Sequence, residues 1–320
     1  MEAPRSAVVV NPVKVPDLES LRRTVCAVLD RAGWPEPEWF ETTPDDAGFG
    51  QATKAVANGA EVVFVCGGDG TVTACVTALA GTDVALAVLP AGTGNLLAAN
   101  LGLNSDVATA VEVAVQGGRR RIDVGVVGDR CFVVMAGMGF DAQMLEGTSE
   151  TAKKHLGWLA YVAGAVKHLR DRPMPIVVSL DGGRPMRRRS RAVIVGNVGR
   201  LQGGVKLLTD ADPADGRLDV AILSPDSLLH WAALAWGVVR GRPRKPLMET
   251  YTARRVEIRS GRRQPRQLDG DLIAPGTGMS ITVRHRALVL CVPQPDSDPD
   301  LAYDVDAVRR AAHGAGEDAR

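Results

Sequence analysis

The feature that most constrains this fold is a short apolar run that leads directly into a glycine-rich turn. Residues 61–66 (EVVFVC) predict a buried strand, after which three glycines surround one acid, Asp69, before a helix predicted over residues 72–79. Only glycine lets the backbone turn so tightly that its N–H groups approach an anion, and a helix N-terminus adds partial positive charge. Because a carboxylate repels bare phosphate, we expect Asp69 to hold Mg²⁺ against nucleotide phosphates or to act as a base. The alternative is a plain strand-to-helix turn, which needs fewer glycines.

A second glycine loop follows the next predicted strand. Residues 84–89 (VALAVL) precede PAGTGN at residues 90–95. Two successive strand-to-helix junctions of a parallel sheet open on the same edge, so both loops are expected to face one nucleotide. No GxxxxGK[ST] motif occurs, which excludes a P-loop.

The pattern of apolar runs predicts two domains. Residues 1–100 alternate short apolar runs with helix-period stretches, which favours an α/β domain with a parallel sheet. After residue 118, short alternating runs predict a mainly antiparallel β domain that starts with a hairpin at Gly128-Asp129. We assign residues 1–121 to the nucleotide-binding domain, completed by residues 286–320, and residues 122–285 to the β domain. Helices are predicted within it at residues 149–169 and 227–240.

Composition excludes several classes of protein. With 45% hydrophobic and 23% charged residues, the chain is expected to fold, and no apolar run approaches the roughly 18 residues of a membrane span. Aromatics at 4% disfavour a stacking platform for nucleic acid, so no nucleic-acid partner is expected. The five cysteines include no CxxC pair, which favours the reducing cytoplasm over a disulfide framework or zinc site.

Positive charge is concentrated in one region. Residues 184–266 carry 18 Lys and Arg against 7 Asp and Glu, and such a surface attracts anionic lipid or phosphorylated ligands. A basic run, made of Arg187, Arg188, Arg189 and Arg191, is either a contact for anionic headgroups or solvated charge at a sheet edge. The helix at residues 227–240, with Trp231 on its apolar side and a basic run after it, suits either an interfacial helix or core packing.

Six short motifs, in order along the chain, resemble those of a known family. They are Asn11-Pro12, GGDGT at 67–71, PAGTGN at 90–95, GFDA at 139–142, ADGRLDV at 214–220 and LDGDL at 268–272. Together they resemble the catalytic family of diacylglycerol kinases, which are bacterial lipid kinases related to sphingosine kinases. GGDG alone is shared with NAD kinases and phosphofructokinases, whereas GTGN and the late DGD favour the lipid kinases.

The resemblance implies a fold, an activity and a location. It implies an NAD-kinase-like parallel sheet in the first domain and a lipid-substrate site in the second. The implied activity is transfer of the γ-phosphate of ATP, with Mg²⁺, to a lipid hydroxyl, with diacylglycerol giving phosphatidic acid in phospholipid biosynthesis. The implied protein is cytoplasmic and associates peripherally with the inner face of the membrane.

The resemblance also implies the site residues. ATP contacts fall on Asn11, Thr43 (with Thr42 as the alternative), Gly67, Gly68, Asp69, Gly70, Thr71, Val72, Thr73, Gly92, Thr93, Gly94 and Asn95. Asp271 or Asp69 is the implied base on the lipid hydroxyl, and Asp69 and Asp269 lie near the catalytic Mg²⁺. A structural Mg²⁺ is implied at the Asp215 side chain and the backbone carbonyls of Asp212 and Arg217.

Departures from the family pattern keep alternatives open. Thr73 and Ala74 stand where the family commonly has Asn and Glu, and Asp271 stands where Glu is more usual. Because a small displacement matters to proton transfer, a catalytically impaired nucleotide- or lipid-binding protein is one alternative, and an NAD kinase is another. A sphingoid base, monoacylglycerol, ceramide or an undecaprenyl-like alcohol would present the same hydroxyl as diacylglycerol. A strand edge in the β domain would allow a homodimer.

Overall fold

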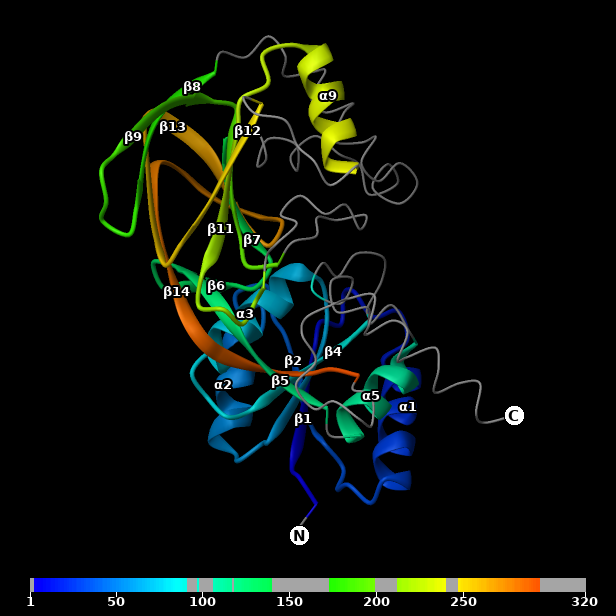
Figure 1. The fold of residues 1–320 in the computed structure, drawn as a ribbon. Helices are drawn as coiled ribbons and strands as arrows, with labels where there is room; N and C mark the ends of the chain where they lie inside the picture. Colours follow the sequence, from blue (N-terminus) through cyan, green and yellow to red (C-terminus); the bar gives the residue numbers. More distant parts are fainter. Residues whose placement is uncertain are drawn as a thin grey trace. The chain divides into compact units, whose positions relative to one another are not determined.

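The structure is a computed structural model that describes residues 3–90, 97, 106–116, 118–139, 173–198, 212–239 and 247–293. The chain divides into two compact units (Figure 1). Unit 1 takes the residues up to Ile122 together with those from Arg286, and unit 2 runs from Asp123 to His285. Each unit has its own core, and one strand, β14 (Asp271–Cys291), belongs to the strand pairing of both units.

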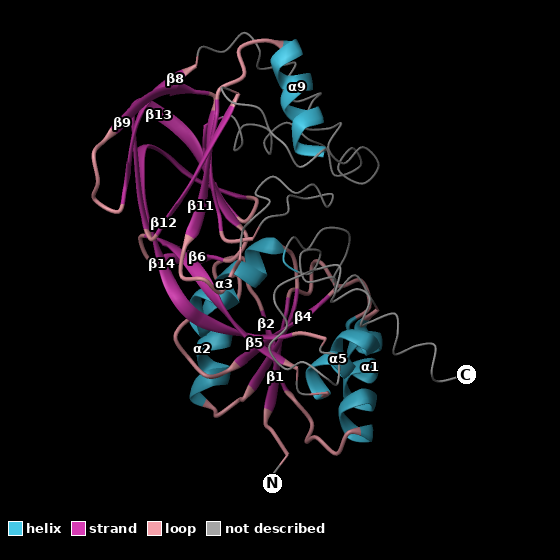
Figure 2. Cartoon of the chain, viewed as in Figure 1, coloured by secondary structure: helices cyan, strands magenta, loops and turns pink. Residues whose placement is uncertain are grey.

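A parallel sheet forms the centre of unit 1. Its strands are β1 (Ser6–Val10), β2 (Glu38–Glu41), β3 (Val62–Cys66) and β4 (Ala85–Leu89), in the order β2-β1-β3-β4, and the end of β14 (Asp271–Cys291) pairs in parallel with β4. The helices are α1 (Leu18–Arg31), α2 (Phe49–Ala57), α3 (Asp69–Leu79) and α5 (Val107–Val115). In Figure 2, α2 and α3 lie together on one face of the sheet and α1 and α5 on the other.

Burial explains why these segments form strands and helices. Every residue of β1, β3 and β4 is buried, as expected for strands covered on both faces. In α1 the buried positions Leu21, Val25, Val28 and Leu29 recur at helical spacing, and Asp17 caps the helix by accepting the Ser20 N–H. The strands predicted from the apolar runs at residues 61–66 and 84–89 are confirmed as β3 and β4. β2 (EWFE) was not predicted, because it has no apolar run.

Unit 2 is a mainly antiparallel sheet. Its strands are the second part of β5 (Arg119–Val127), which crosses the boundary between the units, β6 (Arg130–Phe132), β7 (Met135–Gly139), β8 (Met174–Leu180), β9 (Met186–Ser190), β10 (Ala192–Gly196), β11 (Leu218–Leu223), β12 (Met248–Ala253) and β13 (Arg255–Leu268), with the first part of β14. They pair in the order β12-β11-β10-β7-β13-β14, while β8 and β9 extend from β13. A separate core includes Phe132, Met138, Ile176, Leu218 and Ile258.

The predicted fold class, an α/β domain with a parallel sheet followed by a mainly antiparallel β domain, is confirmed. The predicted hairpin is also present, because Val127 pairs with Arg130 across Gly128 and Asp129. The helix predicted at residues 227–240 is α9 (Leu228–Val239). The helix predicted at residues 149–169, residues 140–142 of the GFDA motif and the basic run after α9 lie outside the described residues. No helix in the described part of the chain is long and apolar enough to cross a membrane.

Candidate functional site

The glycine junction after β3 differs from the sequence prediction. Helix α3 begins at Asp69 with Gly68 as its N-cap, three residues before the predicted start at Val72. A carboxylate in the first turn of a helix is favoured by the helix dipole, and glycine is an accepted N-cap residue. These two start signals outweigh the low helix propensity of Gly70. The loop between strand and helix is therefore reduced to Gly67 and Gly68.

The two loop glycines have different surroundings. A Cβ atom added to Gly67 would lie 2.7 Å from Cβ of Thr71, so the close packing of Thr71 against the end of β3 requires glycine. A Cβ atom added to Gly68 would meet no atom within 4 Å. The space in front of Gly68 is open, and the first N–H groups of a helix have no partners within the helix. This open cradle fits a phosphate group.

The end of β1 meets the same junction. The Asn11 backbone N–H donates to the carbonyl of Cys66 at 2.8 Å, and Asn11 Nδ2 donates to Oγ1 of Thr71 at 3.5 Å. Neighbouring parallel strands end at one edge of the sheet, which is the usual ligand edge of open α/β sheets. The structure thus brings together two of the residues predicted to contact ATP, Asn11 and Thr71.

The other predicted ATP contacts differ in accessibility. Thr43 is exposed in the turn after β2, where its Oγ1 accepts the Asp46 N–H at 3.1 Å, whereas Thr42 is buried. Val72 and Thr73 are buried in α3, which argues against contacts between their side chains and a nucleotide. Gly92, Thr93, Gly94 and Asn95 lie outside the described residues.

In unit 2 the LDGDL motif forms the tip of a hairpin. Leu268 at the end of β13 pairs with Asp271 at the start of β14, and Asp269 and Gly270 connect them with φ angles of 48° and 94°. Positive φ at both central residues defines the type I′ hairpin turn, for which Asp-Gly is a favoured sequence. The sequence analysis missed this turn, although an Asp-Gly pair between alternating strands is its recognised signal.

Asp269 is held by the main chain. Its Oδ2 accepts the Val133 N–H, and its Oδ1 accepts the N–H groups of Val134 and Met135, each at 2.8 Å. Burial raises the pKa of Asp269 to about 6, and the three hydrogen bonds oppose that rise. The predicted contact of Asp269 with a catalytic Mg²⁺ would compete with these three hydrogen bonds.

Asp271 is the more accessible carboxylate of the turn. It is half-buried at the first position of β14. Burial raises the pKa of Asp271, and the nearby Arg130 lowers it. A carboxylate with a raised pKa is a stronger proton acceptor than an ordinary one, as a general base requires.

The loop predicted to bind structural Mg²⁺ is a tight turn in unit 2. The Asp215 N–H donates to the carbonyl of Asp212 at 3.4 Å, and the Arg217 N–H donates to Oδ1 of Asp215 at 2.8 Å. The predicted ligands are all oxygen atoms, which Mg²⁺ prefers. Among the described residues, no group of three His, Cys, Asp or Glu side chains is placed to hold a metal ion. An ion here would therefore depend on a single carboxylate, that of Asp215, together with backbone carbonyls and water.

A buried carboxylate that the sequence analysis missed supports this loop. Asp123 is fully buried; its Oδ2 accepts the Gly216 N–H at 2.6 Å, and its Oδ1 lies 2.9 Å from Nδ1 of His285. Asn197 Nδ2 donates to the carbonyls of Asp123 and Val133 at 2.8 and 2.9 Å. The available signal was an acid within the otherwise apolar stretch IDVGVV at residues 122–127.

Two profiles of known protein domains match this chain, one after the other. The profile of the diacylglycerol kinase catalytic domain matches residues 5–127, and that of the YegS C-terminal NAD kinase beta sandwich-like domain matches residues 133–292. The chain belongs to the diacylglycerol kinase family. For this member of the family, the two profiles together cover both glycine loops, the Asp212–Arg217 loop and the hairpin with Asp271.

Individual relatives carry matching names. A diacylglycerol kinase of Mycobacterium tuberculosis is 34% identical over 179 residues, which are 54% of this chain and 58% of that protein, so the match spans less than two thirds of this relative. A diacylglycerol kinase of Bacillus subtilis is 27% identical over 296 residues, 89% of this chain and 96% of that protein. A probable YegS-like lipid kinase of Pseudomonas fluorescens is 31% identical over 250 residues, 75% of this chain and 80% of that protein.

Solved structures share the fold of this family member. A diacylglycerol kinase structure from Bacillus anthracis has a TM-score of 0.68 at 18% identity and covers 91% of this chain and 98% of that one. An NAD kinase from Archaeoglobus fulgidus, solved with ATP, has a TM-score of 0.53 at 14% identity and covers 96% of this chain and 99% of that one. At these identities the likeness shows the fold alone.

Proposed function

We propose that this protein is an ATP-dependent lipid kinase that phosphorylates a lipid hydroxyl, with diacylglycerol as acceptor and phosphatidic acid as product. The observation that carries the proposal is the open cradle at Gly68, in front of α3 and beside Asn11. Relatives named diacylglycerol kinase and probable lipid kinase support phosphoryl transfer to a lipid. A lipid acceptor places the protein at a membrane surface, where it would associate peripherally.

In unit 1, the proposed role of the β3–α3 junction is to hold the phosphates of ATP. The open side of Gly68 lets the phosphates approach the first N–H groups of α3. Asp69, in the first turn, would hold Mg²⁺, which would take most of its oxygen ligands from phosphate and water. When bound, the ion supplies charge neutralisation of the phosphates. Asn11 orients Thr71 and so fixes the edge of the cradle.

In unit 2, the proposed role of Asp271 is that of general base. As the hydroxyl oxygen of the lipid bonds to the γ-phosphorus, Asp271 accepts the hydroxyl proton, and the bond from the γ-phosphorus to the bridging oxygen breaks to release ADP. The raised pKa of Asp271 suits this proton transfer. Asp69 is the alternative base. The Asp212–Arg217 loop, with Asp215 as its carboxylate, would hold a structural Mg²⁺ that stiffens the unit.

The test measures transfer of labelled γ-phosphate from ATP to diacylglycerol, monoacylglycerol and a sphingoid base in mixed micelles, with NAD as a further acceptor. We expect a labelled lipid with the native chain and strong loss with Asp271→Asn or Asp69→Asn. Asp45→Asn, an exposed acid in unit 1, is the matched control and is expected to keep native turnover. Labelled NAD would show an NAD kinase instead, and ATP binding without transfer to any lipid would favour the catalytically impaired binding protein. Near-native rates in both acid variants would refute the mechanism.

A further inference from the structure

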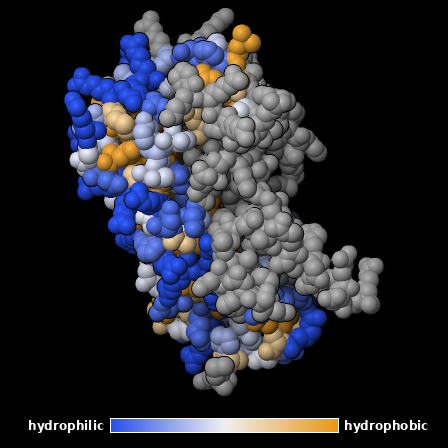
Figure 3. All heavy atoms as spheres, viewed as in Figure 1, coloured by the Kyte–Doolittle hydropathy of each residue, from blue (hydrophilic) through white to orange (hydrophobic). Residues whose placement is uncertain are grey.

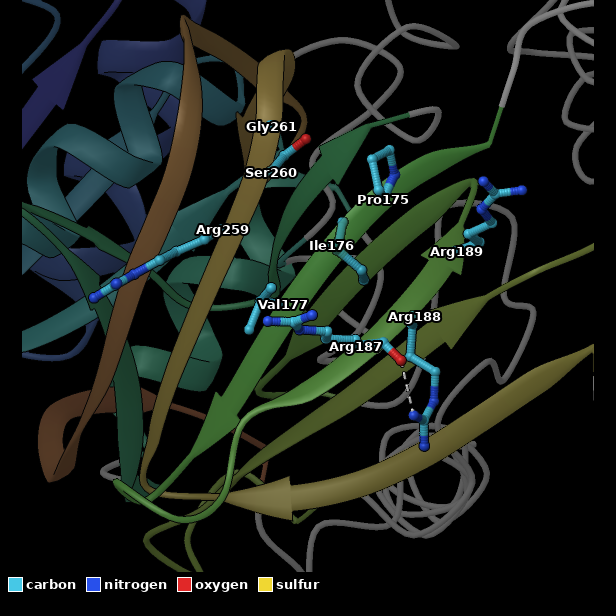
Figure 4. Close-up of a pocket in the computed structure, with 9 residues that line it drawn as sticks. All are labelled: Pro175, Ile176, Val177, Arg187, Arg188, Arg189, Arg259, Ser260 and Gly261. Carbon is cyan, nitrogen blue, oxygen red and sulfur yellow. Dashed lines mark hydrogen bonds between the residues drawn. The ribbon is translucent and has the colours of Figure 1, made fainter.

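A hollow of about 610 Å³ lies on unit 2 where β9, β8 and β13 pair side by side (Figure 4). Its lining combines arginines with apolar side chains. The residues that matter here are Pro175 and Val177 of β8, Arg187 and Arg189 of β9, and Arg259 and Gly261. None of them belongs to the sites described above.

The strand register explains this lining. Val177 pairs with Arg187 on one side and with Arg259 on the other, and Pro175 pairs with Arg189. Paired residues of neighbouring strands project to the same face of a sheet. Val177 therefore lies between two cations and Pro175 lies beside one, and Figure 4 shows Arg187 beside Val177. A Cβ added to Gly261 would meet nothing within 4 Å, so this end of the hollow is open.

The arginines that line the hollow differ in whether they form ion pairs. Arg188, which projects to the other face, is held by Glu249 through hydrogen bonds of 2.8 and 3.1 Å. Arg187 and Arg189 are exposed and have no ion-pair partner within the described residues. The Arg259 side chain is 79% exposed, and its Nη2 lies 3.6 Å from Oε2 of Glu257. Two guanidinium groups are thus available to an external anion, and a third is only loosely held.

The alternation of charged and apolar residues points beyond protection of a sheet edge. Strand β9 pairs only with β8 among the described strands, and charge on an edge strand discourages pairing with other chains. That purpose is served by charge on either face. Such protection does not require apolar side chains beside the cations. Apolar groups next to cations suit an amphiphile, which has a charged part and an apolar part. In Figure 3, hydrophilic residues cover most of the part of unit 2 where β8 and β9 lie, with a small hydrophobic patch among them.

We propose that this hollow binds the headgroup phosphate of an anionic phospholipid at the surface of a bilayer. Arg187 and Arg189 donate to the phosphate oxygens, because the planar guanidinium matches phosphate in a two-pronged geometry. Pro175 and Val177 contact the apolar part of the lipid next to its phosphate. The inference deepens the proposed lipid kinase and rests on it, since such an enzyme meets its acceptor in a membrane. The contact would hold unit 2 at the bilayer independently of nucleotide.

The experiment measures binding of the full chain, without ATP, to phosphatidylcholine vesicles with and without phosphatidylglycerol at about one third of the lipid. We expect the native chain to prefer the anionic vesicles and the double variant Arg187→Gln/Arg189→Gln to lose about tenfold in apparent affinity. The matched control is Arg254→Gln/Arg284→Gln, which removes the same charge from two exposed arginines elsewhere in unit 2 and is expected to stay within about twofold. Equal losses in the two variants, or no preference for anionic vesicles in the native chain, would overturn the proposal.

Further arms separate the source of the phosphate and guard against misfolding. Calorimetry with glycerol 3-phosphate and with inorganic phosphate probes a free anion. Binding that depends on Arg187 and Arg189 without any vesicle binding would assign the hollow to a free phosphate compound and overturn the lipid proposal. Arg187→Lys/Arg189→Lys keeps the charge and loses the two-pronged geometry, so it is expected to bind vesicles more weakly than the native chain. If the glutamine variant fails to fold, undiminished binding by the lysine variant would overturn the proposal. Because the vesicle experiment contains no ATP, its outcome does not depend on whether the kinase assay detects phosphate transfer.

Discussion

Two turns, one in each unit, combine the same residue types with opposite outcomes. In unit 1 the sequence GDG at 68–70 starts a helix, and its acid, Asp69, stands in the first helical turn beside an open cradle. In unit 2 the sequence DGD at 269–271 forms a hairpin turn, and its first acid, Asp269, is closed off by three backbone N–H groups. Only its second acid, Asp271, remains accessible. An acid beside glycine is therefore not in itself a sign of chemistry. The hydrogen-bond partners of each carboxylate decide whether it serves the fold or the site.

The strongest test of this comparison is Asp271→Asn. If Asp271 is the accessible base, the amide loses proton acceptance, and turnover falls about 10² to 10⁴-fold. The unfolding free energy changes by less than about 1 kcal/mol, because no backbone donor in the described part of the chain depends on this carboxylate in the way that three depend on Asp269. Initial rates and denaturant titrations measure the two effects. Native turnover in this variant would show that Asp271 is not the general base.

The converse variant, Asp269→Ala, is expected to act on stability. It leaves the N–H groups of Val133, Val134 and Met135 without their acceptor, so the unfolding free energy falls by about 3 kcal/mol. Asp269→Asn, which retains one carbonyl acceptor, is expected to lose less. Urea denaturation of all three proteins gives the ranking. Equal stability of Asp269→Ala and Asp271→Asn would contradict the distinction between the two acids.

Two glycine variants, Gly68→Ala and Gly67→Ala, test the corresponding turn in unit 1. A methyl group on Gly68 enters open space, so Gly68→Ala is expected to weaken ATP binding about tenfold by filling the cradle, with a stability loss of about 1 kcal/mol or less. Gly67→Ala instead forces Thr71 to move and lowers the unfolding free energy by about 1 to 3 kcal/mol. Calorimetric ATP titration and thermal unfolding separate the two variants. Undiminished ATP affinity in Gly68→Ala would place the phosphates elsewhere.

The smallest expected effect is a shift in pH dependence. Asp271 must be ionised to accept a proton, so activity falls as the pH falls through its pKa, which burial raises from the usual value of an aspartate. Arg130 lowers that pKa, and Arg130→Gln is therefore expected to move the acid limb of the kcat/KM profile to higher pH. Arg254→Gln serves as the charge control. An acid limb that stays in place would argue for Asp69 as the base.

Much of unit 1 could be predicted from sequence, because fully buried parallel strands are continuous apolar runs that end in glycine. The start of α3 was placed too late, since the low helix propensity of glycine hid the helix that begins at Asp69. The surroundings of Asp269 could not be predicted. Its three donors lie 134 to 136 positions away in the chain, and only the register between β13 and β7 brings them to the turn. Asp123 was missed for the same reason, because its partners come from distant segments of unit 2.

The path of β14 has a consequence for how the protein is made. Val289 and Leu290 of this strand complete the sheet of unit 1 beside Ala85 and Leu86 of β4, yet the ribosome must first synthesise all of unit 2. At ordinary elongation rates this delay lasts on the order of ten to forty seconds. During that time the nascent first unit presents an unpaired strand edge, the kind of surface that pairs with other chains. Completion of the sheet of unit 1 therefore waits for the synthesis of unit 2, and a chain released before Val289 would lack the strand that pairs with β4.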